Sequence, residues 1–153
     1  DGHAHAASVG DSRLYLLRDG CIYQMTADDS AVGALVAQGL ISRAEARHHA
    51  DRNVILRALG THADVQVSHW EQPLPLRDGD ALLLCSDGLT DLVEDDEIAD
   101  AIGDRHGADA CRILVSMARN RGGHDNITVA LLRVGTPAVD RAVAPTREMR
   151  VPR

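Results

Sequence analysis

The dipeptide Asp19-Gly20 lies between two runs of strand-forming residues, 14–17 and 21–25. An Asp-Gly pair in that setting is the strongest short-range signal for a β-hairpin. The segment 77–80, Arg-Asp-Gly-Asp, is a further turn, and the apolar run Ala-Leu-Leu-Leu-Cys follows it at 81–85. A continuous apolar run of this length is typical of a strand buried on both faces. The turns therefore favour a mainly antiparallel sheet.

Helix-capping residues follow the hairpin. Ser30 is suited to begin a helix and Gly39 to end it, while Ser42 and Glu45 form a capping box for a second short helix through about His49. Two later helices are predicted at 95–102 and 108–120, and further strands at 3–9, 54–59, 65–69 and 127–134. This mixed order of strands and helices predicts an α+β fold.

Charge and length exclude several classes of protein. The 153 residues fit one domain, and the net charge of −7 makes the chain a poor binder of nucleic acid. No apolar run approaches the roughly 20 residues that cross a bilayer, so no membrane segment is expected. The cysteines, Cys21, Cys85 and Cys111, are odd in number and lack zinc-binding spacing. Reduced thiols and a cytoplasmic location are therefore predicted.

The two ends of the chain differ from its middle. Residues 136–153 hold three of the five prolines and show no periodicity, which predicts a flexible tail or linker. The chain starts at Asp1, not at methionine, and a strand is expected almost at once. We therefore expect it to be a piece of a longer protein, with one domain over residues 1–135.

Three aspartates share an unusual setting. Asp11, Asp87 and Asp125 each lie at the start or the end of an apolar strand, beside small or turn-forming residues. Carboxylates at strand ends can converge on hard divalent cations such as Mg²⁺ or Mn²⁺. An aspartate after a strand is, however, more often a turn residue. Residue patterns alone thus support an α+β domain without a defined function.

Five sequence blocks, in order, resemble those of the metal-dependent protein phosphatases of the protein phosphatase 2C family. They are Gly10-Asp11-Ser12-Arg13, Ala27-Asp28-Asp29-Ser30, the run 52–60 (Arg-Asn-Val-Ile-Leu-Arg-Ala-Leu-Gly), Ser86-Asp87-Gly88-Leu89 and Asp125-Asn126-Ile127-Thr128. The resemblance covers about residues 3–134. The flap-like segment at about 28–60 most resembles the bacterial members, which reverse serine/threonine kinase signalling.

The resemblance implies a fold and a set of metal ligands. The fold would be a sandwich of two stacked antiparallel sheets flanked by helices, present only in part. Asp87 and Asp125 would bind a catalytic pair of Mn²⁺ or Mg²⁺ ions, and Asp11, with Asp87, would hold a third, weaker ion. Three residues would support these ligands: Asn126, which would orient Asp125, and Gly88 and Gly123, which would allow tight turns. Arg13 is expected to anchor structure.

The activity implied is hydrolysis of phosphoserine and phosphothreonine in proteins by a metal-activated water. No catalytic residue is implied beyond the metal ligands. The expected partners are phosphorylated proteins, with a serine/threonine kinase among them.

Two elements of the family pattern are absent from this chain. They are an arginine for the substrate phosphate and a DGMGG-type motif whose aspartate bridges both metals; Asp1-Gly2 lies too close to the first block to be that motif. We therefore expect the C-terminal part of a catalytic domain, with little activity alone. The alternative is a non-catalytic pseudophosphatase or regulatory binding module, against which the three aspartates argue. A third possibility, the stress-regulatory branch, is disfavoured by the first block and the flap helices.

Overall fold

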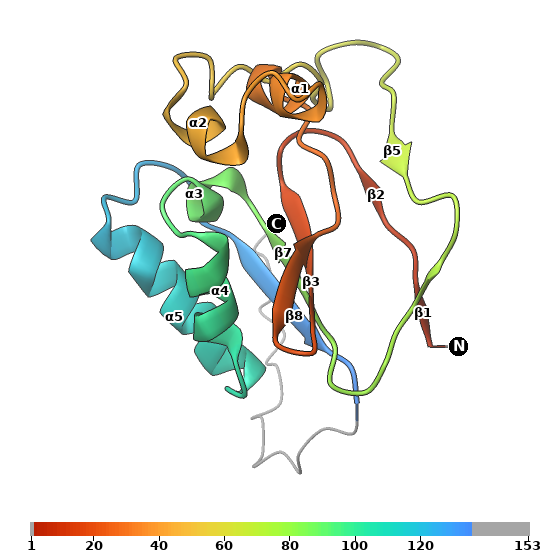
Figure 1. The fold of residues 1–153 in the computed structure, drawn as a ribbon, viewed down its shortest axis with the longest axis vertical. Coiled ribbons are helices and arrows are strands. Elements are labelled where there is room, and N and C mark those ends of the chain that lie inside the picture. The colour runs from red at the N-terminus through yellow and green to blue at the C-terminus, as the bar shows by residue number, and fades with distance from the viewer. Residues whose placement is uncertain (1, 136–153) are drawn as a thin grey trace, which may run out of the picture.

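The computed structural model describes residues 2–135, with a four-stranded sheet at the centre (Figure 1). The strand order is β4-β3-β7-β8, formed by Cys21–Gln24, Arg13–Arg18, Ala81–Cys85 and Val129–Arg133. Every strand pairing is antiparallel, as the turn sequences predict. The predicted tail, 136–153, lies outside the described residues.

The β3–β4 hairpin turns at Asp19 and Gly20. Their φ angles are 53° and 76°, both in the left-handed region. Positive φ at both central residues is the geometry of a type I′ turn, whose twist matches that of the paired strands. Arg18 pairs with Cys21 on either side of the turn, which confirms the hairpin prediction.

Two helices cover one face of the sheet, α4 (Asp95–Ile102) and α5 (Gly107–Asn120) (Figure 1). Each lies within one residue of its predicted bounds. Their apolar faces pack on the sheet because alternate residues of β3 and β7 point toward them. The side chains of this core that are fully buried include Tyr15, Leu83, Ile98, Ile102 and Leu114.

A smaller second layer lies on the opposite face of the sheet. It is made of two short ladders, β1 (His3–Ala4) with β6 (Leu74–Pro75) and β2 (Ala7–Ser8) with β5 (Ser68–His69). The side chains that meet between the two layers include Leu14, Leu16, Leu82, Trp70 and Leu74. Two layers of antiparallel strands, flanked by helices, confirm the predicted α+β sandwich.

The strand β7 is buried on both faces along only part of its length. Leu82 is 6% exposed beneath the second layer, whereas Leu84 is 52% exposed and Leu132 of the neighbouring strand is 56% exposed. The prediction of burial on both faces therefore holds for Leu82 and is wrong for Leu84. The physical reason is that the short second layer ends before it reaches the outer part of the β7–β8 pair.

Three other predicted strands were wrong in extent or in kind. The segment 3–9 breaks into β1 and β2, and only Ser68–His69 is paired in the segment 65–69. The apolar segment 54–59 is not a strand; it makes one bridge, between Ser30 and Ile55, and Leu59 is 76% exposed. Strand propensity reflects packing on neighbours, and this segment has no strand beside it.

The flap-like segment contains α1 (Ala31–Ala37) and α2 (Arg43–His48), which lie at one end of the sheet (Figure 1). Ser30 caps α1, and Ser42 with Glu45 forms the predicted capping box of α2. A further one-turn helix, α3 (Asp87–Thr90), was not predicted. Among the described residues, no helix has the length and apolar character needed to cross a membrane.

The thiols are expected to differ sharply in reactivity. Burial raises the pKa of Cys85 to about 12, whereas Cys21 is exposed at the hairpin. Because the thiolate is the reactive form, iodoacetamide at pH 8 should alkylate Cys21 and spare Cys85 until denaturant is added. Peptide mass spectrometry checks this pattern, and rapid labelling of Cys85 in the folded protein would contradict it.

Candidate metal-binding site

The register of the central sheet brings the three predicted aspartates to one edge. Arg13 pairs with Cys85, and Cys85 pairs with Val129. Asp11 therefore precedes β3, Asp87 follows β7 and Asp125 precedes β8, all at the same end of the three strands. The antiparallel pairing alone places these three strand ends at one edge of the sheet.

Ser86 and Gly88 hold the turns that carry Asp87 and Asp125 against each other. The Ser86 hydroxyl donates to the carbonyl oxygen of Asn126 at 2.9 Å and accepts from the Thr128 N–H at 3.1 Å. A Cβ placed on Gly88 would lie 2.4 Å from the same Asn126 carbonyl oxygen. Only glycine allows this approach of two backbones, which explains why an Asp-Gly pair occurs here.

Asp125 is held by its own loop. Its carboxylate accepts a hydrogen bond from the Asn126 N–H at 2.6 Å, so Asn126 contacts it through the main chain. Gly123 has a φ of 54°, which lets the chain turn after α5. Asp125 is exposed, and it is not among the residues that line the cavity beside Asp11 and Asp87.

A cavity of about 620 Å³ lies between the flap helices and the α3–α4 segment. Asp11 and Asp87 line it from the sheet edge, and Asp91 lines it one helical turn beyond Asp87. From the flap, Arg43 and Arg47 line the same space. The cavity thus joins two of the three predicted ligands to a carboxylate that the sequence reasoning missed. The spacing Asp87 to Asp91, four residues across a helical turn, was the signal available for it.

The carboxylates in the cavity disfavour one another's charge. The pKa of Asp11 is raised above its ordinary value by burial first and by the charge of Asp87 second. The pKa of Asp91 is raised by the same two causes in the same order. Carboxylates that repel each other are stabilised in the ionised form by a bound cation.

The residues present fit a hard divalent cation in part. Asp11, Asp87 and Asp91 offer carboxylate oxygens, the ligand type that Mg²⁺ and Mn²⁺ prefer. Over residues 2–135, however, no three acidic, histidine or cysteine side chains are grouped closely enough to enclose an ion. A complete site would need further ligands from water or from residues outside this range.

Two adjacent aspartates of the second block fasten the flap to the sheet. Asp28 accepts three hydrogen bonds from the Arg13 guanidinium at 2.6–3.1 Å, which confirms Arg13 as a structural anchor. Asp29 is 5% exposed, accepts from the Gly10 N–H at 3.1 Å and pairs with Arg57. The first three sequence blocks are therefore bound to one another through these two carboxylates.

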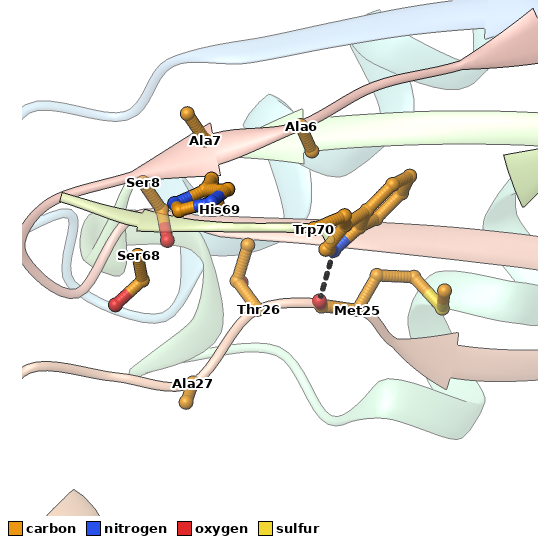
Figure 2. A pocket seen from close by; sticks show the side chains of 9 residues that line it. All are labelled: Ala6, Ala7, Ser8, Met25, Thr26, Ala27, Ser68, His69 and Trp70. Carbon is orange, nitrogen blue, oxygen red and sulfur yellow. Dashed lines mark hydrogen bonds between the residues drawn. The ribbon is translucent and has the colours of Figure 1, made fainter. Parts of the chain in front are cut away.

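A second, smaller hollow lies beside Trp70 and has no carboxylate in its lining (Figure 2). The Trp70 indole N–H donates to the carbonyl oxygen of Met25 at 3.2 Å, and Trp70 packs against the cluster of Leu14, Leu16 and Leu82 on the central sheet. This arrangement supports packing as the role of Trp70.

Comparison with known proteins identifies the family. No protein-family model matches the chain. The serine/threonine phosphatase Stp of Listeria welshimeri is 40% identical over 127 residues, which are 82% of this chain and 50% of that protein. The PPM Ser-Thr phosphatase MsPP of Mycobacterium smegmatis, solved with cacodylate, superposes with a TM-score of 0.79 at 38% identity over 86% of this chain and 56% of that one. The chain belongs to the PPM phosphatase family.

One solved relative bears on the metal. The catalytic domain of the phosphatase PstP, in complex with two manganese ions, is 38% identical and superposes with a TM-score of 0.70. That match covers 86% of this chain and 53% of the PstP domain. The chain thus spans about half the length of the relatives that it resembles.

Replacing Gly88 with alanine should destabilise the protein by about 1–3 kcal/mol, the typical cost of overpacking. The added Cβ would meet the Asn126 backbone, which cannot move without opening the β7–β8 pairing. Gly107→Ala is the matched control, because a Cβ there has no neighbour within 4 Å, and it should leave stability unchanged or raise it by up to about 1 kcal/mol. Urea unfolding compares the two; equal effects would contradict the close approach.

Proposed function

We propose that the chain is part of the catalytic domain of a Mn²⁺- or Mg²⁺-dependent serine/threonine protein phosphatase. The observation that carries the proposal is the cavity that Asp11, Asp87 and Asp91 share at the edge of the sheet. The similarity to named serine/threonine phosphatases supports the reaction, and the manganese-bound PstP domain supports the metal.

Each acidic residue has a proposed part in the site. Asp87 and Asp125 bind the catalytic pair of ions, and Asp11 with Asp87 holds a third. We add Asp91 as a further carboxylate near that third position, because it lines the same cavity and its pKa is raised by the charge of Asp87. When bound, the ions would supply a water of lowered pKa that attacks the phosphate. Asn126, Gly88 and Gly123 keep the two turns in place.

An uncovered apolar strip supports the proposal that a larger catalytic domain contains this chain. Leu84 and Leu132 lie on the sheet face opposite α4 and α5, and both are more than half exposed. We propose that the other half of the domain covers this strip and completes the metal site. The chain's coverage of only about half of its relatives is consistent with this.

The substrates proposed are proteins phosphorylated on serine or threonine, with a serine/threonine kinase among them. A cytoplasmic location is proposed as well, supported by three free thiols, Cys21, Cys85 and Cys111.

The test is turnover of a phosphothreonine peptide by the full-length protein, with Mn²⁺ and with chelator. Asp87→Asn and Asp91→Asn should each lower turnover at least about 10-fold. Mutating even the residues that hydrogen-bond to metal ligands typically lowers metal affinity or activity by about 10–100-fold. Asp100→Asn is the control, because its exposed side chain lies on α4 outside the cavity. Turnover that survives both Asp87→Asn and chelator would refute the proposal and favour a non-catalytic binding module.

The 153-residue chain by itself should show little or no turnover with Mn²⁺. Its described residues lack a complete group of ligands, so the ions would be held weakly. The same peptide assay measures this. Robust hydrolysis by the chain alone, lost in Asp87→Asn, would show that these residues suffice.

A further inference from the structure

Arg47 binds the flap to the α3–α4 segment through hydrogen bonds and an ion pair. It extends from α2, and it is half-buried, with 23% of its side chain exposed. Its Nη1 donates to the Thr90 carbonyl oxygen at 2.5 Å, and its Nη2 donates to the Val93 carbonyl oxygen at 3.1 Å. An ion pair with Glu94 at 2.9 Å completes the contact. One guanidinium thus joins the flap helix α2 to the α3–α4 segment.

The Thr90 carbonyl lies at the C-terminal end of α3, where helical N–H donors run out. The Val93 carbonyl lies in the connection just before Glu94, the N-cap of α4. Thr90 is 3% exposed, so its carbonyl needs a protein partner in place of water. A cation at this end also interacts favourably with the helix dipole. Arg47 therefore caps the short helix that begins at Asp87.

The peptide group between Thr90 and Asp91 connects Arg47 to the backbone of both aspartates. Its carbonyl oxygen accepts from Arg47, while its N–H, which belongs to Asp91, donates to the Asp87 carbonyl oxygen at 2.8 Å. The peptide unit is planar and rigid, so fixing its oxygen also fixes its N–H. The backbone positions of Asp87 and Asp91 are thereby tied to the flap through a single planar group.

We propose that Arg47 is a positioning residue that couples the flap to the carboxylate pair Asp87 and Asp91. It acts through the Thr90–Asp91 peptide group and does not itself bind the ion. This inference rests on the proposed metal site. It adds a connection between that site and the flap helix α2. By linkage, a cation bound at these carboxylates must stabilise the docked flap to the same extent that the docked flap favours cation binding.

Arg43 provides a matched control for Arg47. It lies one helical turn earlier on α2 and lines the same cavity. Unlike Arg47, it is exposed, and within the described structure its guanidinium makes no hydrogen bond or ion pair. Removing Arg43 takes the same charge from the same helix and leaves the peptide group untouched.

The experiment measures Mn²⁺ affinity by calorimetry in the full-length protein. Arg47→Ala should raise the Kd for Mn²⁺ about 10-fold, as expected for a residue that positions metal ligands without binding the metal itself. Arg43→Ala should change it less than about 2-fold. Arg47→Lys, which keeps the charge but cannot bridge two carbonyls, should fall between them. Equal affinities in Arg47→Ala and Arg43→Ala would overturn the coupling.

Hydrogen exchange supplies a readout that an ordinary stability loss would not give. Mn²⁺ should slow exchange across 43–48 in the wild type and in Arg43→Ala, and should fail to do so in Arg47→Ala. If Arg47→Ala is too unstable to study, Arg47→Lys is used, with partial loss expected. Flap protection by Mn²⁺ that persists in the Arg47 variant would overturn the proposal.

Failure of the metal site is distinguishable from failure of the coupling. If the wild type binds no Mn²⁺, the proposed function fails. Hydrogen exchange measured without metal then tests whether Arg47 couples the flap to the α3–α4 segment. Arg47→Ala should then speed exchange across 87–94 as well as 43–48, while Arg43→Ala should not. Unchanged exchange across 87–94 in Arg47→Ala would overturn the positioning role.

Discussion

The antiparallel pairing of β7 with both of its neighbours is the constraint on which the rest of the structure depends. It fixes which residues of β3 and β8 stand beside Cys85, and so brings three turns to one end of the sheet. The same strand buries Leu83 completely against α4 and α5. A shift of one residue would turn that face outward and would separate the turns at once. Core and candidate site are therefore specified by one register.

The family's sequence blocks acquire a physical meaning in this arrangement. The first three meet at Asp28 and Asp29, whose carboxylates hold Arg13, Gly10 and Arg57. The last two meet at the Asn126 carbonyl oxygen, which accepts a hydrogen bond from the Ser86 hydroxyl and lies against Gly88. Charged pairs fasten the flap, and close backbone contact fastens the two ligand turns. The cavity lies beside both contacts, and Asp87 and Asp91, at the start of α3 and just after its end, contribute carboxylates to its lining.

Sequence reasoning succeeded where the decisive interactions are local. The Asp19-Gly20 turn and the Ser42–Glu45 capping box each depend on residues within three positions of one another. It failed for 54–59, whose apolar residues have strand propensity but no strand beside them. It also missed Asp91 and Arg47, because their importance comes from a cavity formed by segments more than 40 residues apart in the chain.

The sequence by itself determined the hairpin, the helix caps, the order of the five blocks and the aspartates at strand ends, because each rests on short-range chemistry. The tertiary structure alone decided which carboxylates share a cavity. It placed Asp91 with Asp11 and Asp87, left Asp125 outside the lining, and set Arg47 on the Thr90 carbonyl. The physical reason is that strand register and flap docking bring distant residues together, and neither can be read from the spacing of residues along the chain.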